Sequence, residues 1–432
     1  MTKKSSTPAI RFKGFTDTWE QRKLGDMMNV TSVKRIHQSD WTDSGVRFLR
    51  ARDIVAAAKN EEPDDYLYIS KEKYEEYSAL SGKVGVSDLL VTGVGTIGVP
   101  YLVRNLEPLY FKDGNIIWFQ NSDKIDGKFL FYSFSAEQIQ GFINESAGIG
   151  TVGTYTIESG KKTPISLPNQ IEQAKVGEFF QQLDNLITLH QRKYDKLTNV
   201  KKSMLEKMFP KNGSNVPEIR FKGFTEAWEQ RKLSEIATMH ARIGWQNLRT
   251  SEFLDSGDYM LITGTDFIDG AVNFDTCHYV ERERYEQDKH IQIRNGSILI
   301  TKDGTLGKVA YIQGLTMPAT LNAGVFNVEI KDENEVDNRY LFQYLKAPFL
   351  MDYVDKKATG GTIKHLNQNI LVDFPVVLPH KAEQEKIGEY FLAIDHLITL
   401  HQCEFQIVSK RRKARLRRRA FGFTVIFALI VL

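Results

Sequence analysis

Apolar side chains recur at intervals of three and four residues between positions 171 and 210. The recurring positions are Val176, Phe179, Leu183, Leu186, His190, Leu197, Val200 and Met204. This spacing is typical of a coiled-coil seam, and neither Gly nor Pro interrupts it between Gly177 and Pro210. The pattern predicts one helix of roughly 35–40 residues, about 55–60 Å long. Because an apolar stripe of this length must be covered, we expect a partner helix.

The chain itself supplies a candidate for that partner helix. Residues 383–402 read EQEKIGEYFLAIDHLITLHQ, and residues 397–402 repeat residues 186–191 letter for letter. If the two helices pair in antiparallel fashion, Leu183 and Leu186 should both be buried. The predicted interface positions, within the helix pair or toward a partner, are Val176, Phe179, Leu183, Leu186, Ile187, Ile387, Phe391, Ile394, Leu397 and Ile398.

The chain consists of two copies of one sequence repeat. Residues 10–24, IRFKGFTDTWEQRKL, differ from residues 219–233 at two positions only. Each opening motif is followed by about 140 residues of weaker similarity, a Leu-Pro pair and a long helix, which is the pattern of an internal repeat. The predicted boundaries are a first globular domain over 1–170, a first long helix over 171–211, a second globular domain over 212–381, a second long helix over 382–421 and an apolar tail over 422–432.

The globular domains have a mixed but strand-rich pattern. Residues 87–103 and 297–312 each predict two strands joined by a Gly-rich turn. Residues 111–120 and 325–330 predict further strands, and residues 128–136 and 339–346 predict short helices. The predicted fold class is α+β, with two mixed, strand-rich domains separated by an antiparallel pair of long coiled-coil helices and related by a pseudo-twofold repeat.

The run from Gly93 to Gly98 matches the dinucleotide-binding pattern G-x-G-x-x-G. That site needs a helix N-terminus after the glycines, whereas the residues that follow here predict a strand. The second copy has Lys302 and Asp303 before Gly304 and lacks the first glycine. We therefore predict a hairpin turn rather than a cofactor site.

Glu329 with Lys331 at a strand end resembles half of a nuclease metal site. The corresponding strand of the first copy carries no such pair, which favours a solvated strand end. No histidine pair has zinc-protease spacing, and His190 and His401 occupy equivalent places in the two helices, where seam or flank positions are expected. The chain is therefore predicted to be non-catalytic and to bind no metal.

Composition adds only weak constraints. The formal charge of +3 does not by itself indicate nucleic acid. Cys277 and Cys403 have no metal-like or paired spacing, so we expect reduced thiols and a cytoplasmic location. The N-terminus lacks the apolar core of a signal peptide, and the apolar run over 421–432 is shorter than the roughly 17–20 residues that span a bilayer. No membrane association is expected.

Together these motifs resemble the specificity subunit of type I restriction–modification enzymes. The resemblance covers the chain to about residue 402. It is carried by the twin R-F-K-G-F-x-x-x-W-E-Q-R-K-L openings, the twin G-T-[IL]-G turns, the Leu-Pro pair before each helix and the repeated E-Q-x-K-[IV]-G-E-[FY]-F motif at 172–180 and 383–391.

The resemblance implies a DNA sequence-recognition subunit. Each target-recognition domain would read one half of a split, asymmetric site in double-stranded DNA, and the helix pair would set the unread gap. Methylation and cleavage would belong to two modification (methyltransferase) subunits and to restriction (translocase and nuclease) subunits. Those partners would bring S-adenosylmethionine, ATP and Mg²⁺, and this chain would bind no cofactor of its own.

Base edges and phosphates are contacted by basic groups and by free backbone N–H groups on turns. The candidates for DNA contact are Arg47, Arg50, Arg52, Gly95, Thr96 and Gly98 in the first domain, and Lys302, Gly304, Thr305, Gly307, Lys308, Lys364 and His365 in the second. A solvated surface charge is the alternative for each basic residue, and a purely structural turn is the alternative for the glycines.

One departure concerns the end of the second helix. The positions of Leu197, Val200, Met204 and Met208 in the first helix are taken in the second by Val408 and by arginines 411, 415 and 419. Three charged seam positions of four put the last third of the helix pairing in doubt.

Two other functions remain open: a coiled-coil scaffold whose domains bind protein, and a metal-dependent nuclease acting through Glu329.

Overall fold

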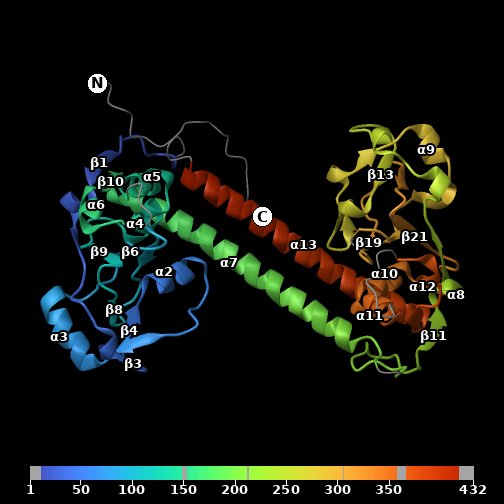
Figure 1. Cartoon of the computed structure of the whole chain (residues 1–432), viewed down its shortest axis with the longest axis horizontal. Coiled ribbons are helices and arrows are strands. Elements are labelled where there is room, and N and C mark those ends of the chain that lie inside the picture. Colours follow the sequence, from blue (N-terminus) through green and yellow to red (C-terminus); the bar gives the residue numbers. More distant parts are fainter. Residues whose placement is uncertain (1–10, 148–152, 212–213, 305, 358–365, 418–432) are drawn as a thin grey trace. The chain divides into compact units, whose positions relative to one another are not determined.

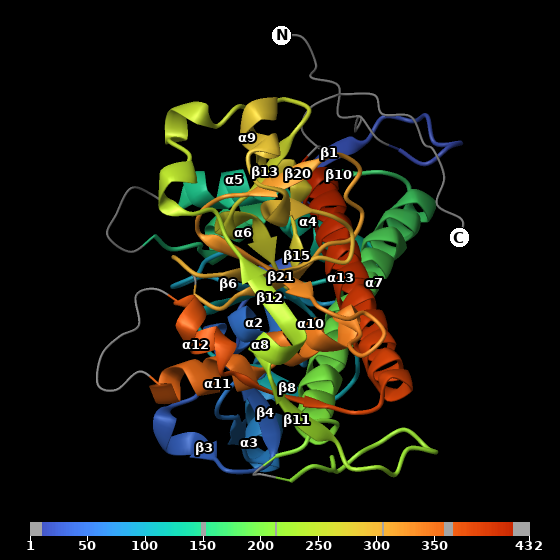
Figure 2. The ribbon, with the colours of Figure 1, turned by 90° about the vertical axis from the view of Figure 1, so that its right-hand side faces the viewer.

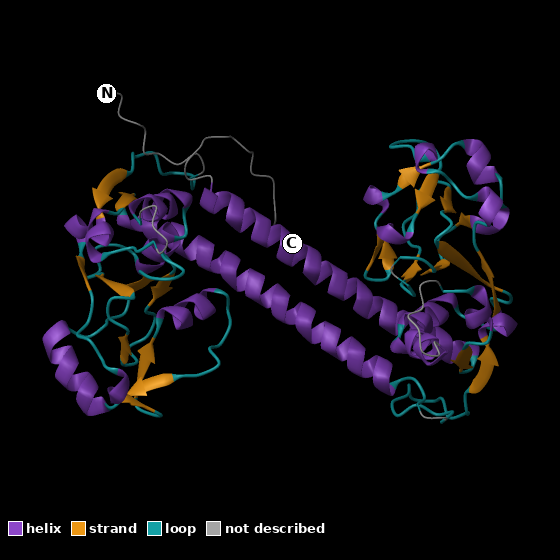
Figure 3. Cartoon of the chain, in the orientation of Figure 1, coloured by secondary structure: helices purple, strands orange, loops and turns teal. Residues whose placement is uncertain are grey.

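The computed structural model describes residues 11–147, 153–211, 214–304, 306–357 and 366–417. The chain divides into two compact units, residues 1–191 with 403–432 and residues 192–402. Each unit contains one globular domain and a part of each long helix. Both units mix helices and strands (Figure 3), and the predicted α+β class is confirmed. The predicted apolar tail lies outside the described residues.

The first unit contains two four-stranded sheets and a two-stranded ribbon. The first sheet has the order β2 (Asn29–Thr31), β9 (Ile116–Gln120), β6 (Leu89–Thr92) and β7 (Pro100–Leu102). The second has the order β3 (Trp41–Thr42), β5 (Leu67–Ile69), β4 (Val46–Leu49) and β8 (Leu109–Phe111), in which β4 and β8 are parallel. The ribbon pairs β1 (Glu20–Lys23) with β10 (Pro164–Leu167). The helices are α1 (Leu24–Met27), α2 (Ala51–Ala58), α3 (Lys71–Ser81), α4 (Gly127–Phe134), α5 (Glu137–Ser146) and α6 (Ile157–Lys162).

The second unit repeats this plan. Its first sheet has the order β12 (Ala237–His240), β21 (Val325–Ile330), β18 (Ile298–Thr301) and β19 (Val309–Tyr311), and β12 and β21 lie side by side in Figure 2. The second has the order β16 (His278–Tyr279), β13 (Met260–Ile262), β20 (Ala319–Leu321) and β17 (Gln292–Ile293), again with one parallel pair. The ribbons are β11 (Glu229–Lys232) with β22 (Pro375–Leu378), and β14 (Phe267–Ile268) with β15 (Ala271–Val272). The helices are α8 (Leu233–Ile236), α9 (Arg282–Glu286), α10 (Asn338–Lys346), α11 (Pro348–Lys357) and α12 (Gln368–Val372).

Both predicted hairpins form. The glycines of the dinucleotide-like pattern lie between β6 and β7, which are antiparallel neighbours. The second copy of the turn joins β18 and β19 in the same way. The prediction of a hairpin turn is therefore confirmed, because a strand follows the glycines where a phosphate site needs a helix. The predicted short helices correspond to α4 and α10.

The two long helices are α7 (Gln170–Lys207) and α13 (Lys381–Arg417), green and red in Figure 1. In the first unit, Asp184 and His190 of α7 contact Arg412 and Glu404 of α13. In the second unit, Lys201 of α7 contacts Asp395 of α13. In the first unit, rising numbers on α7 thus meet falling numbers on α13, which is the predicted antiparallel arrangement.

The burial of the seam differs from the prediction. Leu183 is partly buried and packs against the core of the first unit, but Leu186 is 42% exposed and its repeat counterpart Leu397 is 41% exposed. The inner face of α7 includes Val176, Phe180 and Asp184, and Leu186 lies about 200° around the helix from Asp184. The prediction that both leucines are buried is therefore wrong for Leu186. Of the other predicted positions, Val176, Ile387, Phe391 and Ile394 are buried, and Phe179, Ile187 and Ile398 are partly buried.

Each opening motif is fixed to the first turns of a long helix by an ion pair. Arg11 Nε and Nη2 each donate to a carboxylate oxygen of Glu172 at 2.7 Å, and Glu172 is fully buried. Arg220 repeats this two-point contact with the fully buried Glu383 at 2.7 and 2.8 Å. These hydrogen bonds raise the pKa of both arginines. Two-point arginine–carboxylate pairs of this kind are the strong form of a charged hydrogen bond. We call these two pairs the twin anchors.

The neighbouring motif residues hold each globular domain on its helix. In the first unit, Gln173 accepts from the backbone N–H of Asp126 at 3.0 Å and donates to the carbonyl of Pro168 at 2.8 Å. A Cβ at Gly177 would lie 2.9 Å from the backbone nitrogen of Phe129, at the start of α4. Only glycine allows this approach without displacement.

The second unit repeats both features. Gln384 accepts from Asp337 N–H and donates to the carbonyl of Pro379. A Cβ at Gly388 would lie 2.8 Å from the nitrogen of Tyr340. The repeated E-Q-x-K-[IV]-G motif is therefore explained by the packing of each domain on its helix.

Replacing Arg220 with Met should destabilise the second unit by about 3–5 kcal/mol, because Glu383 would stay buried without its partner. The measurement is the free energy of unfolding in urea, followed by a probe in the second unit. The matched control is Arg282→Ala, which removes an exposed ion pair with Glu286 and should cost less than about 1 kcal/mol. Equal effects of the two changes would show that the anchor is not a major stabilising contact.

Candidate nucleic-acid interface

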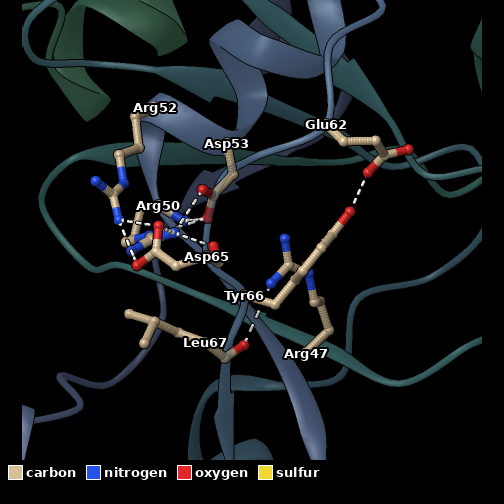
Figure 4. A network of polar contacts seen from close by, with 8 residues as sticks. All are labelled: Arg47, Arg50, Arg52, Asp53, Glu62, Asp65, Tyr66 and Leu67. Carbon is tan, nitrogen blue, oxygen red and sulfur yellow. Dashed lines mark hydrogen bonds and ion pairs between the residues drawn. The ribbon is translucent and has the colours of Figure 1, made fainter. Parts of the chain in front are cut away.

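The three candidate arginines of the first domain form two neighbouring groups in Figure 4, Arg50 and Arg52 around Asp65, and Arg47 against Tyr66. Arg47 belongs to β4, Arg50 is the residue before α2, and Arg52 lies in the first turn of α2. Asp65, just before β5, accepts hydrogen bonds from both Arg50 and Arg52. The structure thus brings together residues that the sequence placed only near one another in the chain.

Arg50 is held by two carboxylates. Its Nη2 donates to Asp53 Oδ1 at 2.9 Å, and its Nη1 donates to Asp65 Oδ2 at 2.8 Å. Burial lowers the pKa of Arg50, but the hydrogen bonds with Asp65 and Asp53 outweigh it, so the net shift is upward. With a side chain only 14% exposed, Arg50 serves to position the start of α2.

Arg52 is the more accessible member of the group. Its side chain is 62% exposed, and Nη2 donates to Asp65 Oδ1 at 2.6 Å. Hydrogen bonding with Arg50, supported by the charge of Arg52, lowers the pKa of Asp65. The carboxylate therefore stays charged and holds the exposed guanidinium in place, where a DNA phosphate or base edge could replace it.

Arg47 lies over an aromatic ring. Its guanidinium carbon is 3.9 Å from the ring centroid of Tyr66, which is 43% exposed and donates a hydrogen bond to Glu62. An arginine stacked on an exposed tyrosine presents both a cation and a flat apolar face. Such a surface suits contact with nucleic acid. The sequence predicted Arg47 as a candidate for DNA contact but not its partner Tyr66.

The basic candidates of the second domain are more scattered. Lys302 is partly buried with its ammonium 5.4 Å from the ring centroid of Phe326, so it packs along the domain surface. Lys308 is exposed and directly precedes β19, the strand after the turn. Thr305, Lys364 and His365 lie outside the described residues, and their predicted role stays a prediction.

The twin glycine turns have a structural explanation. Gly95, Gly98, Gly304 and Gly307 all have φ between 68° and 77°, a region that favours glycine. Thr92 and Thr301 close the two turns, because their hydroxyls accept from the backbone N–H groups of Val99 and Lys308 at 2.9 Å. Thr96, Gly95 and Gly304 are exposed, so the tips of the turns remain open to a ligand.

Comparison with known proteins decides the family. The model of the type I restriction modification DNA specificity domain matches residues 16–199 and again residues 225–407. The chain belongs to the type I restriction–modification DNA specificity family. This confirms the resemblance that the motifs indicated, including the two recognition domains and the role of a DNA-specificity subunit.

Relatives of this specificity-family chain agree with the assignment. It is 24% identical over 310 residues to the MjaVIII specificity subunit of a type I restriction enzyme from Methanocaldococcus jannaschii, covering 68% of this chain and 69% of that protein. It is 23% identical to the putative MjaX specificity subunit of the same organism, covering 92% and 91% of the two chains. The crystal structure of a type I restriction–modification S subunit from M. genitalium has the same fold, with a TM-score of 0.58 at 16% identity over 97% of this chain and 100% of that chain.

Sequence reasoning missed the partners that organise the arginines. Asp53, Asp65 and Tyr66 were not selected, although the run EEPDDYLY at 61–68 places acidic and aromatic residues directly before a strand. Glu329 was expected at a solvated strand end, and its carboxylate is indeed about half exposed, but it lies beside His240 and His290. Those histidines come from distant positions, so no local motif marked them.

Among the described residues no helix is long and apolar enough to cross a membrane.

Helix α13 continues through the arginine-rich segment, where the sequence put the helix pairing in doubt. The helix runs to Arg417, and Leu416 is 6% exposed in the core of the first unit. Arg412 binds Asp184, which also accepts a hydrogen bond from Tyr132 at 2.8 Å. The doubt about the final third of the helix pair is thus removed as far as residue 417.

The second unit has the equivalent contacts 211 positions away. Asp395 accepts hydrogen bonds from Lys201 at 2.6 Å and from Gln343 at 2.8 Å. Burial is the largest cause that lowers the pKa of Lys201, to about 8, and the charge of Lys346 adds to it. Arg412 therefore occupies the place that Lys201 has in the other copy, so this part of the basic run keeps the repeat.

Of the arginines at altered seam positions, Arg415 is partly buried. Its guanidinium lies 4.6 Å from the ring centroid of Phe179, and burial lowers its pKa. Arg411 is exposed, and residue 419 lies outside the described residues. The counterpart of Arg415 in the first helix is Met204, which packs against the core of the second unit.

Replacing Arg415 with Met should raise the free energy of unfolding of the first unit by about 1 kcal/mol, because an apolar side chain replaces a partly desolvated charge. Thermal unfolding measures this change. The control is Arg411→Val, which alters an exposed position and should leave the stability within about 0.5 kcal/mol of the parent. A loss of stability in Arg415→Met would mean that the contact with Phe179 outweighs the burial of the charge.

Proposed function

We propose that this chain recognises a bipartite, asymmetric DNA sequence within a type I restriction–modification complex. Each globular domain reads one half of the site. The observation that carries the proposal is the contrast between the twin anchors, which are the same in both units, and the surfaces on the sheets, which differ. One frame that carries two different surfaces suits two different ligand sequences.

The two long helices supply the fixed gap between the half-sites. α7 has 38 residues, which at 1.5 Å per residue corresponds to about 57 Å. α7 and α13 each contain residues of both compact units. A continuous helix is a stiff connection, so the spacing of the two half-sites becomes a property of the protein.

Two methyltransferase subunits are the proposed constant partners. The repeat duplicates a surface as well as a core: Leu186 and Leu189 are exposed on α7, and Leu397 and Leu400 are exposed at the equivalent positions of α13. Exposed apolar residues that occur twice in one chain suit two copies of one partner. Restriction subunits complete the complex, and the partners bring S-adenosylmethionine, ATP and Mg²⁺. We infer a cytoplasmic location, where these partners and the DNA meet.

The surface around Arg52 is the proposed contact of the first domain with DNA. Arg52 is exposed and is oriented by Asp65, whose neighbour in the chain, Tyr66, carries the stacked Arg47. Asp65 neutralises this region in the free protein, and DNA would compete for the guanidinium. The alternative function, a protein-binding scaffold, would leave these residues without a role in DNA affinity.

Exchanging residues 25–165 for the same segment of another family member should change one half of the recognised sequence and leave the other half unchanged. The exchange keeps the anchors and helices, so the frame is unaltered. Mapping of methylated sites in cells that also carry the partner subunits gives the result. The reciprocal exchange of residues 234–374 is the control and should change the other half. A change of both halves in either exchange would refute the assignment of one domain to one half.

Replacing Arg52 with Ala should weaken binding of the assembled complex to its DNA site by about 1–3 kcal/mol if the residue reads a base. If it contacts a phosphate instead, the loss of affinity should be similar for all DNA sequences. The slope of log affinity against log salt concentration should then decrease in magnitude by about one. The control is Lys83→Ala, which removes another exposed ion pair of the same domain. Wild-type affinity in Arg52→Ala would exclude this side chain from the interface.

A further inference from the structure

Three possible metal ligands converge on the first sheet of the second unit. His240 at the end of β12, His290 in the turn Lys289–Ile291 and Glu329 in β21 come from three separate segments. Glu329 Oε2 lies 3.7 Å from His240 Nε2 and 3.9 Å from His290 Nδ1. All three ligand atoms lie within 4.8 Å of one another.

The surroundings hold these side chains near one another. The two imidazole rings are stacked, with centroids 4.4 Å apart and planes 20° apart. Asn327 Nδ2 donates to the carbonyl of His290 at 2.9 Å, which ties the turn to β21. His240 Nε2 is also 3.0 Å from Thr238 Oγ1. Two imidazoles and one carboxylate are therefore brought together by two paired strands and the turn tied to them.

We propose that His240, His290 and Glu329 bind a divalent transition metal ion, with Zn²⁺ as the best fit. Two histidines and one glutamate are a ligand set of zinc sites that keep a fourth position for water or a substrate group. In a tetrahedral site with zinc–ligand distances of about 2.0–2.1 Å, neighbouring ligand atoms lie about 3.4 Å apart. The separations of 3.7 and 3.9 Å from Glu329 exceed this value by only a few tenths of an ångström, and the separation of the two imidazole nitrogens is at most 4.8 Å.

The required adjustment falls on side chains that can move. The side chains of His290 and Glu329 are 65% and 48% exposed, so each can turn toward a common centre without disturbing the core. The rings leave their stacked arrangement when both nitrogens point at one ion. A cavity of about 270 Å³, lined in part by His290 and Glu329, adjoins the cluster and leaves room for water on the ion.

The proposed site belongs to the second domain alone. The pairing of β2 with β9 matches that of β12 with β21: Asn29 faces Gln120 as Thr238 faces Glu329. By this register Thr31 and Gln120 of the first domain occupy the places of His240 and Glu329. Neither is a good ligand for zinc, so the site is a feature of one diverged surface and not of the shared frame. It does not rest on the proposed DNA recognition.

The ion would link three segments of one sheet region. It would also change the local charge, because Glu329 contributes one negative charge and the ion two positive charges. Since a ligand that binds only the folded state stabilises it, added Zn²⁺ should raise the unfolding temperature of the second unit. This readout is independent of any DNA or partner subunit.

The test is titration of the full-length, untagged chain with ZnCl₂ by calorimetry, and with CoCl₂ by visible absorption. The parent chain should bind one Zn²⁺ that is lost or weakened at least about tenfold in His290→Ala and in Glu329→Gln, with ligand-field bands for Co²⁺ that disappear in both. Without metal, both variants should unfold at the temperature of the parent, which separates loss of a ligand from loss of structure.

Two controls exclude other metal-binding groups. His278→Ala removes an exposed histidine elsewhere in the same unit, and His190→Ala removes the imidazole that lies 2.9 Å from Glu404 in the first unit. Both should keep Zn²⁺ binding and the thermal shift of the parent. The proposal is overturned if the parent chain binds no Zn²⁺ or Co²⁺ stoichiometrically, or if His290→Ala and Glu329→Gln bind as tightly as the parent.

Discussion

The ion pair between each opening motif and the first turns of its long helix is the contact on which the rest of the architecture depends. Glu172 and Glu383 are fully buried, and each is satisfied by a two-point contact with an arginine about 160 residues earlier in the chain. A buried carboxylate without such a partner would be strongly destabilising. The start of each repeat is therefore bound to the helix that ends the same repeat, so the two ends of the repeat are held together.

This closure explains how one chain can carry two different surfaces. The residues that repeat closely are those that fasten the domain to its helix: the anchor arginine and glutamate, the glutamine beside them and the glycine that permits close approach. The polar contacts that make this fastening involve the opening motif, the proline before the helix and the start of α4 or α10, and not the residues of the four-stranded sheets. Changes such as Thr31 against His240, or the arginine group of the first domain, therefore leave the frame intact. DNA recognition by two diverged domains on one repeated scaffold follows from this separation.

The long helices combine apolar packing with polar contacts. Asp184 and Asp395 hold equivalent places, and each is satisfied by a cation from the other helix and by a side chain of the adjacent globular domain. Such polar contacts are satisfied in one register only, so they favour that register over neighbouring ones. The exposed leucines 186, 189, 397 and 400 are left on the outside of this arrangement, where a repeated partner surface is proposed.

Much of this fold could be predicted from the sequence, because its signals are periodic or repeated. The helices, the hairpins at β6–β7 and β18–β19, the fold class and the family all rest on such signals. The burial of Leu186 was predicted wrongly, because a three–four spacing does not fix which edge of the stripe faces the partner. Asp65, Tyr66 and the pair His240 and His290 were missed for another reason. They meet their partners only through sheet pairing, which brings together segments that no local pattern connects.

Reading of a split DNA site by two domains can be tested by a genome-wide map of methylated adenines in cells that contain this chain together with methyltransferase and restriction subunits. We expect one bipartite, asymmetric sequence, with two specified parts separated by an unspecified gap of constant length. Methylation of a single uninterrupted sequence, or of two parts at variable spacing, would contradict the claim that two domains on a stiff helix pair read the DNA.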